Sequence, residues 1–274
     1  MDFKGRVAFI TGATRGVGKC LALALARAGA DIVVAAKSVE ENPRLPGTIY
    51  SAAAEVEALG RRALPVQVDV RDDRAVEAAV KAALDRCGRI DFLVNNAGAL
   101  FWQPLADTPL PRFDRVMGVN VRGAFACCHH VLPAMLAQGW GHILMMSPPL
   151  DAAAAAGKIA YAVSKFGMTL IAHGLAGELE GKNVACNALW PATLIESYAT
   201  INFGLGGPPM WRKPEILADA ALRIFAKKPA SFTGHALIDE DFLRSEGVTD
   251  FTRYRCDPGH EPPHVGFDFR FQAG

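Results

Sequence analysis

Short apolar segments alternate with longer stretches of helical periodicity along most of this 274-residue chain. This alternation is typical of βαβ units, in which buried parallel strands are joined by right-handed helical crossovers. It predicts an α/β fold, a Rossmann-type doubly wound parallel sheet of about seven strands flanked by helices. The expected strands are Val7–Thr11, Asp31–Ala36, Ala63–Val68, Ile90–Asn95, Gly141–Ser147, Asn183–Leu189 and His235–Asp239. The expected helices are Gly16–Ala28, Ile49–Leu59, Arg74–Cys87, most of Pro111–Gln138, Ala160–Glu180 and Pro214–Ala226.

No Pro-, Gly- or Ser-rich linker divides the chain, and its composition shifts only after about Asp241. An α/β protein of this size is often a single domain. We therefore expect one domain over residues 1–241. Residues 242–274 are expected to form a C-terminal extension that packs on this domain or on a neighbouring subunit. In the extension, Phe267, Phe269 and Phe271 alternate with polar residues and would form an unusual apolar row if exposed.

The bulk composition argues against several classes of partner. The net charge is only +1, so no general attraction to nucleic acid is expected. No uncharged apolar stretch reaches membrane-spanning length, which predicts no membrane insertion. The six cysteines lack the spacing of metal ligands, so no metal site is expected. The N-terminal residues contain no apolar signal core and the last residues match no known address, which favours a cytoplasmic protein.

A glycine-rich loop lies between the first expected strand and the first expected helix. Glycines there permit a tight turn and the close approach of a dinucleotide pyrophosphate. The amino end of the following helix presents unpaired N–H groups and a positive dipole end to that anion. The loop predicts a phosphate site formed by Gly12, Ala13, Thr14, Arg15, Gly16, Val17 and Gly18.

Tyr161 and Lys165 lie four residues apart in an expected helix, which places them on one helical face. A tyrosine has an ordinary pKa of about 10, so acid–base chemistry at neutral pH requires its phenolate to be stabilised. Each unit of pKa lowering needs about 1.4 kcal/mol. A neighbouring ammonium group is a suitable source, so this pair is the predicted catalytic centre.

Three motifs occur in a characteristic order: Gly-x-x-x-Gly-x-Gly, then Asn95-Asn96-Ala97-Gly98, then Tyr-x-x-x-Lys. From Val7 to about Asp239 the chain resembles the short-chain dehydrogenase/reductase family. The resemblance implies an oxidoreductase that transfers hydride between a nicotinamide cofactor and a carbonyl/alcohol pair. It also implies that Lys165 binds the nicotinamide ribose and that Asn120 orders a proton-relay water. Members commonly pair through two long helices, which implies a homodimer or homotetramer.

The family's serine, which hydrogen-bonds the substrate oxygen, has no direct match. Ser147 lies one residue upstream of the expected place, and Pro148 occupies it. Proline has no hydrogen-bond donor. Two alternatives remain: the Pro148-Pro149 loop brings Ser147 back into reach as a catalytic residue, or the enzyme works with tyrosine and water alone.

The second expected strand ends at Ala36-Lys37-Ser38, without the acid that would bind the ribose of NAD. Lys37 and Arg15 could instead neutralise the 2′-phosphate of NADP. We therefore expect NADP (NADPH) as the cofactor. The remaining cofactor contacts implied by the resemblance are Asp69, Val70, Asn96, Ala97, Gly98, Pro191 and Thr193, of which Asp69 could equally be a turn or helix-capping residue.

Less general strings, such as Leu45-Pro46-Gly47-Thr48 and Ser147-Pro148-Pro149-Leu150, narrow the resemblance to one branch of the family. The resemblance to this branch favours NADP over NAD as the cofactor. It also implies that the proline at the serine position is a trait of the branch.

The expected pocket walls are Leu100–Leu105, Leu150–Lys158 and Leu194–Trp211, the last being either a mobile lid or a static loop. These stretches are apolar and predict a small hydrophobic substrate. Two other functions stay open: an NADP(H)-binding sensor or scaffold with little catalysis, and an acyl-thioester reductase of lipid metabolism.

Overall fold

A seven-stranded parallel sheet forms the centre of the computed structural model, which describes residues 1–150 and 155–264. Its strand order is β3-β2-β1-β4-β5-β6-β9, which confirms the predicted doubly wound sheet. The order reverses between β1 and β4, so a crevice is expected outside the carboxyl ends of these two strands. The strands are β1 Val7–Thr11, β2 Asp31–Ala36, β3 Ala63–Gln67, β4 Phe92–Asn95, β5 Gly141–Met145, β6 Val184–Trp190 and β9 Ala236–Ile238.

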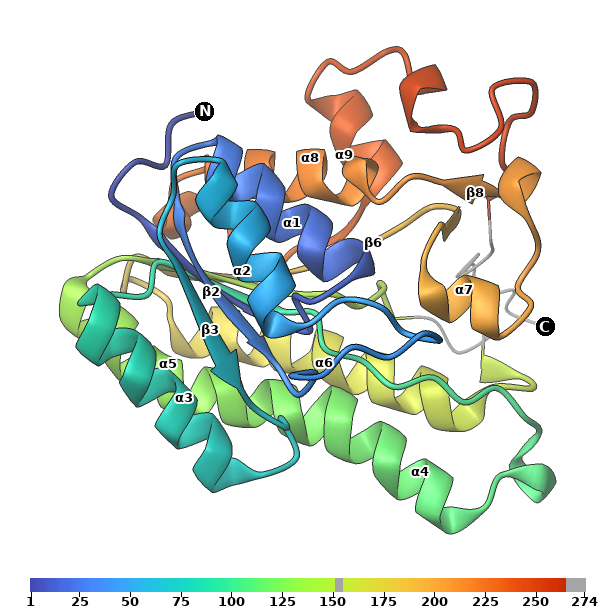
Figure 1. Cartoon of the computed structure of the whole chain (residues 1–274), viewed down its shortest axis with the longest axis horizontal. Coiled ribbons are helices and arrows are strands. Elements are labelled where there is room, and N and C mark those ends of the chain that lie inside the picture. Colours follow the sequence, from blue (N-terminus) through green and yellow to red (C-terminus); the bar gives the residue numbers. More distant parts are fainter. Residues whose placement is uncertain (151–154, 265–274) are drawn as a thin grey trace.

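Helices cover both faces of the sheet (Figure 1). One layer contains α1 Gly16–Arg27, α2 Ile49–Ala58 and α8 Glu215–Phe225, and α9 Asp239–Ser245 packs on α8. The other layer contains α3 Asp73–Cys87, α4 Leu110–Met117, α5 Gly123–Gln138 and α6 Ile159–Glu178. The apolar faces of these two layers form separate cores on the two sides of the sheet, as expected when parallel strands are buried on both faces.

The single long helix expected within Pro111–Gln138 is interrupted. A π-helical turn over Gly118–Arg122 separates α4 from α5 and contains Asn120. Such turns insert an extra residue into a helix and often mark functional sites. The interruption therefore gives the side chain of Asn120 a direction that an unbroken helix would not.

Helix α6 has the length and apolar composition of a helix that could cross a membrane. Its sequence includes Ser164 and Lys165, both of which are buried against the rest of the protein. The helix also packs on β5 and β6. A core helix of a globular domain meets the same two criteria, and α6 occupies that place here.

A second, two-stranded sheet was not anticipated. β7 Leu194–Ile195 pairs in parallel with β8 Trp211–Arg212, and the chain between them contains α7 Tyr198–Asn202. Residues 255–264, which we name the C-terminal strap, run beside this sheet. The row of Phe267, Phe269 and Phe271 lies outside the described residues.

Candidate active site

The glycine-rich loop packs so closely on the end of β4 that a side chain at Gly12 or Gly18 would collide with it. A Cβ atom on Gly12 (φ +67°) would lie 3.0 Å from the Cα of Ala97. A Cβ atom on Gly18 would lie 2.4 Å from both Asn96 Nδ2 and the carbonyl oxygen of Gly12. Helix α1 begins at Gly16, and its N-cap residue Arg15 makes no side-chain capping hydrogen bond. The loop is therefore a backbone cradle that fits a dinucleotide pyrophosphate.

Thr11 and Asn96 hold this cradle in place. Thr11 Oγ1 accepts hydrogen bonds from the backbone N–H groups of Asn96 and Ala97, both at 3.0 Å. Asn96 Nδ2 in turn donates to the carbonyl oxygens of Thr11 (2.9 Å) and Gly12 (3.2 Å). The role of Thr11 was not predicted, although a threonine immediately before the glycine loop was visible in the sequence. Asn95 points elsewhere, with Nδ2 3.4 Å from Cys128 Sγ.

Replacing Gly18 with alanine is expected to weaken NADPH binding by about tenfold or more. Overpacking a tight contact costs roughly 1–3 kcal/mol, and the loop can relieve it only by moving off Asn96. The dissociation constant from NADPH fluorescence measures the effect. Gly174→Ala is the matched control, because that exposed helical glycine has no atom within 4 Å of an added Cβ. Equal NADPH affinity in both variants would contradict the cradle.

Arg15 lies at the carboxyl end of β2. Its guanidinium donates to the carbonyl oxygens of Pro46 (3.0 Å) and Gly47 (2.7 Å) and to Ser38 Oγ (3.0 Å). Lys37 is the neighbour of Ser38 and is exposed. Arg15 thus contacts the residue that follows Lys37, the other cation that the sequence singled out.

Asp69 forms a two-bond ion pair with Arg71, with Nη2–Oδ2 at 2.6 Å and Nε–Oδ1 at 3.0 Å. The hydrogen bond from Arg71 lowers the pKa of Asp69. Its Oδ1 also accepts from the backbone N–H of Arg71, so Asp69 shapes a turn. The adenine contact remains a prediction. Val70, beside it, is buried and occupies the space that a side chain on Gly123 would need.

Tyr161 and Lys165 are both buried on α6, with Lys165 Nζ 5.9 Å from the centre of the Tyr161 ring. Lys165 Nζ donates to the carbonyl oxygen of Met146, just beyond β5, at 2.8 Å. A Cβ on Gly98, just beyond β4, would lie 3.8 Å from the same nitrogen. The pair therefore lies at the carboxyl edge of the sheet, beside the cradle.

Burial works against both charged forms of this pair. Desolvation raises the pKa of Tyr161 above its ordinary value and lowers the pKa of Lys165 to about 7. The sequence led us to expect that Lys165 lowers the pKa of Tyr161. In the structure, desolvation by burial is the dominant influence on this phenol and raises its pKa, and an adjacent positive charge would oppose that effect.

Asn120 links the loop after β4 to α6. Its Nδ2 donates to the carbonyl oxygen of Ala99 (3.0 Å) and to Ser164 Oγ (2.9 Å), while its Oδ1 accepts from the N–H of Ala99 (2.7 Å). Ser164 Oγ donates onward to the carbonyl oxygen of Tyr161 (2.7 Å). Asn120 therefore fixes the backbone that carries Tyr161 and Lys165. Its contact with a relay water stays a prediction, and the part played by Ser164 was missed.

Ser147 is fully buried, and its Oγ lies 2.9 Å from Thr169 Oγ1. The carbonyl oxygen of Pro148 is also within hydrogen-bond distance of Thr169 Oγ1, whose hydroxyl has one proton to donate. These contacts hold the segment against α6. The full burial of Ser147 favours the second alternative from the sequence, in which no serine donates to the substrate.

The buried side chain of Asp239 holds the loop after β6 in place. The N–H of Ala192 donates to Asp239 Oδ1 at 2.8 Å, and burial raises the pKa of Asp239 to about 7. Thr193, in the same loop, is buried and pairs with His264 of the C-terminal strap. Pro191 precedes them at the end of β6. These residues position the loop from which a contact with the nicotinamide amide is predicted.

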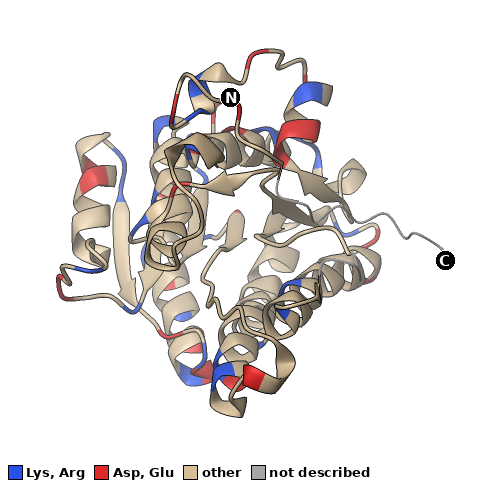
Figure 2. Ribbon diagram, turned by 90° about the vertical axis from the view of Figure 1, so that its right-hand side faces the viewer, with Lys and Arg blue, Asp and Glu red and all other residues tan. Residues whose placement is uncertain are grey.

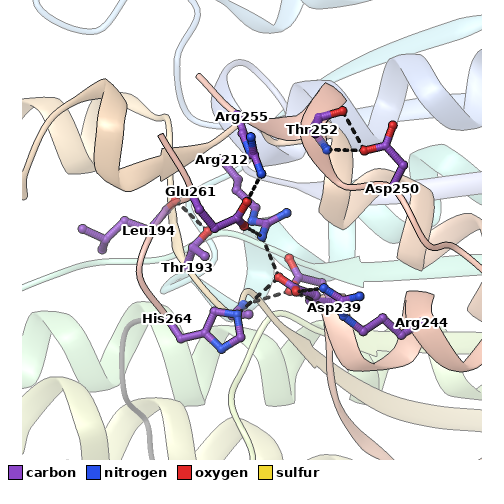
Figure 3. Close-up of polar contacts among 12 residues, drawn as sticks. Thr193, Leu194, Arg212, Asp239, Arg244, Asp250, Thr252, Arg255, Glu261 and His264 are labelled. Atoms are coloured by element: carbon purple, nitrogen blue, oxygen red, sulfur yellow. Dashed lines mark hydrogen bonds and ion pairs between the residues drawn. The ribbon is translucent and has the colours of Figure 1, made fainter. Parts of the chain in front are cut away.

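A buried charge cluster ties the C-terminal strap to β8 and α9 (Figure 3). Arg212, whose side chain is 1% exposed, pairs through Nη2 with Glu240 at 2.8 Å and with Glu261 of the strap at 2.5 Å. Arg244 Nη2 lies 2.6 Å from Glu240, and His264 Nε2 lies 3.4 Å from it. Burial opposes ionisation of Glu240, but the hydrogen bond from Arg244 and the charge of Arg212 lower its pKa. Apart from the adjacent acids Asp239, Glu240 and Asp241, no sequence pattern indicated this cluster.

Comparison with known proteins agrees with this arrangement. A family model of short chain dehydrogenases matches residues 6–199. The chain belongs to the short-chain dehydrogenase/reductase family. The hydroxysteroid dehydrogenase-like protein 2 sequences from Danio rerio and Homo sapiens are each 46% identical over 261 residues, covering 93% of this chain. This confirms the narrower resemblance, and the chain spans 62% of the length of these relatives.

Solved structures show the same fold. A short chain dehydrogenase from Mycobacterium thermoresistibile is 42% identical with a TM-score of 0.89, covering 96% of this chain and 94% of that one. More distant members differ in cofactor. One from Mycobacterium paratuberculosis is bound to NAD (25% identity, TM-score 0.74, covering 87% and 97%). A metagenomic short-chain oxidoreductase is in complex with NADP (27% identity, TM-score 0.73, covering 86% of this chain and 96% of that one). Family membership therefore establishes an oxidoreductase that binds NAD or NADP, without selecting between the two cofactors.

Proposed function

We propose that this chain is an NADP-dependent oxidoreductase that interconverts a carbonyl and an alcohol on a small hydrophobic molecule. The observation that carries the proposal is the burial of Tyr161 and Lys165 together at the carboxyl edge of β4 and β5, next to the glycine cradle. A phenol and an amine in a water-poor site suit proton transfer to a carbonyl oxygen.

Different residues of the chain bind the cofactor and transfer the proton in this proposal. The cradle and the amino end of α1 hold the pyrophosphate, and Lys165 binds the nicotinamide ribose. A nicotinamide bound there would supply or accept the hydride and, when oxidised, would add a positive charge that favours the phenolate of Tyr161 in the direction of alcohol oxidation. Tyr161 then donates its proton to the carbonyl oxygen, or accepts it in the reverse direction, while Asn120 fixes the helix that carries both side chains.

The preference for NADP rests on the end of β2. Arg15 is fixed beside Ser38, Lys37 precedes that serine, and the last strand residues, Ala35 and Ala36, carry no carboxylate. Two cations and a hydroxyl group match the charge and hydrogen-bonding capacity of a ribose 2′-phosphate.

Lys37→Asp should lower the affinity for NADPH about 10- to 100-fold and leave NADH binding equal or stronger. Hydrogen bonds to charged groups contribute roughly 1.5–3 kcal/mol, and the new carboxylate would repel the 2′-phosphate. Dissociation constants for both cofactors measure the change. Lys182→Asp, an exposed lysine before the amino end of β6, provides the charge-matched control. If the two variants keep the same NADPH to NADH ratio, Lys37 does not select the cofactor.

A hydrophobic substrate is supported by the segments that the sequence predicts as walls of the pocket. Leu105, Tyr198, Ile201, Phe203 and Met210 are large apolar side chains that the described chain leaves exposed. On the face that includes α7 and β8, charged residues lie mainly around the edge (Figure 2). An apolar ligand would cover part of this surface.

Assay of the purified protein with NADPH against aldehydes, ketones and acyl-thioesters tests the proposal. Consumption of NADPH with an aldehyde or ketone is the expected result. Tight NADPH binding without turnover of any compound would instead favour a sensor, and turnover of acyl-thioesters alone would favour the lipid-metabolic reductase.

We also propose that the protein is a homo-oligomer. Phe125 on α5 and Leu170 on α6 are exposed apolar side chains on the two long helices. Burying them against a second copy would remove this surface from water.

A further inference from the structure

The proposed reaction leaves one chemical need unmet. Negative charge develops on the substrate oxygen as the carbonyl carbon is reduced, and a second hydrogen-bond donor beside the tyrosine would stabilise it. Pro148 has no donor to offer. Ser147 is fully buried, with its Oγ 2.9 Å from Thr169 Oγ1. A donor from another wall of the site would meet this need.

Trp102, in the loop after β4, has an indole nitrogen without a partner. Its Nε1 is buried and makes no hydrogen bond in the part of the chain that the structure describes. An indole N–H is only a donor, and leaving a buried donor unpaired costs roughly 1–3 kcal/mol. Unpaired buried groups in a folded protein are few, and each calls for an explanation.

The place of Trp102 supplies that explanation. Its ring meets the ring of Tyr161 edge to face, with centres 5.9 Å apart. Lys158 Nζ lies 5.2 Å from the centre of the Trp102 ring, on its face. This cation–π contact fixes the plane of the indole and draws electron density from the ring. Of the buried side-chain donors without a partner in the described chain, Trp102 Nε1 is the one whose ring packs on Tyr161.

We propose that the indole N–H of Trp102 donates a hydrogen bond to the oxygen of the substrate carbonyl and takes the place of the absent serine. The inference rests on the proposed carbonyl reduction. In that step a C–H bond forms at the carbonyl carbon with hydride from NADPH, the C=O π bond breaks, and its oxygen takes the proton of Tyr161. Trp102 keeps its own proton and stabilises the charge on that oxygen.

The test compares Trp102→Phe with wild type on the aldehyde or ketone that wild type reduces fastest, from a panel that runs from acetophenone to decanal. Phenylalanine keeps an aromatic ring beside Tyr161 and removes only the N–H. The expected result is a fall in kcat/KM of about 100-fold, the usual effect of losing one such donor. The NADPH dissociation constant should stay unchanged. Trp140→Phe is the matched control. Trp140 packs on Arg6 and Phe92 at the amino end of β5, whereas the site lies at the carboxyl end of that strand.

A second measurement does not depend on turnover or on the variant folding. Wild type labelled with ¹⁵N-tryptophan is saturated with NADP⁺ and then titrated with acetophenone or with α-methylstyrene, which replaces the C=O group with C=CH₂. The Trp102 indole proton should shift downfield with the ketone only. Retention of kcat/KM within about twofold in Trp102→Phe, or equal indole shifts with both compounds, would overturn the proposal. Failure of wild type to reduce any carbonyl would reject the proposed function instead.

Discussion

Replacing Tyr161 with phenylalanine should reduce turnover by about 1,000-fold while NADPH binds as in wild type. General acid–base groups contribute roughly 10²- to 10⁴-fold to rate, and the variant loses the proton donor without loss of ring packing. Burial raises the pKa of this phenol, which favours its protonated, proton-donating form. Single-turnover oxidation of NADPH by the best substrate measures the loss.

Tyr50→Phe controls for the general effect of losing a phenol, since Tyr50 is 58% exposed on α2. That variant should turn over at the wild-type rate. A Tyr161→Phe enzyme that kept more than about a tenth of wild-type turnover would show that another group supplies the proton. Loss of NADPH affinity in the same variant would instead assign Tyr161 a structural role.

The sheet and the cofactor cradle could be predicted from the sequence because their signals are local. Apolar runs such as Val7–Thr11 become buried strands, and Gly12 and Gly18 stand where a Cβ atom would collide with the loop at Asn96 and Ala97. The ends of β1 and β4 can approach each other because glycine stands at these two contact positions. Similarly, the separation of Tyr161 from Lys165 fixes their common helical face.

Other features depend on contacts between distant segments and gave no local signal. The orientation of Ser147 is decided by Thr169, 22 residues further along the chain. The π turn at Asn120 lies inside an otherwise regular helical pattern. The β7–β8 sheet has strands of only two residues, too short for a period-2 pattern to identify. In each case tertiary packing selects a geometry that many sequences could adopt.

Arg212→Met should lower the free energy of unfolding by about 3 kcal/mol, because removing one partner of a buried ion pair leaves the other charge uncompensated. Methionine fills much of the volume of the arginine side chain, so the loss of stability measures the effect of removing the charge. Glu240 keeps its pair with Arg244, which places the effect near the lower end of the usual range. Urea unfolding measures the loss. Trypsin should also cut faster after Arg253 and Arg255, because the C-terminal strap loses the contact of Glu261 with Arg212.

The double variant Arg212→Met, Glu240→Gln decides whether charge is the cause. Replacing both members of a buried pair by uncharged groups is often nearly neutral, so the double variant should recover much of the stability that the single variant loses. Lys81→Met provides the surface control, because its pair with Asp85 is exposed and should contribute about 0.5 kcal/mol or less. If the double variant were as unstable as the sum of its two parts, the cluster would act through packing around Arg212 and not through its charges. The strap would then be held on the β7–β8 sheet by shape alone.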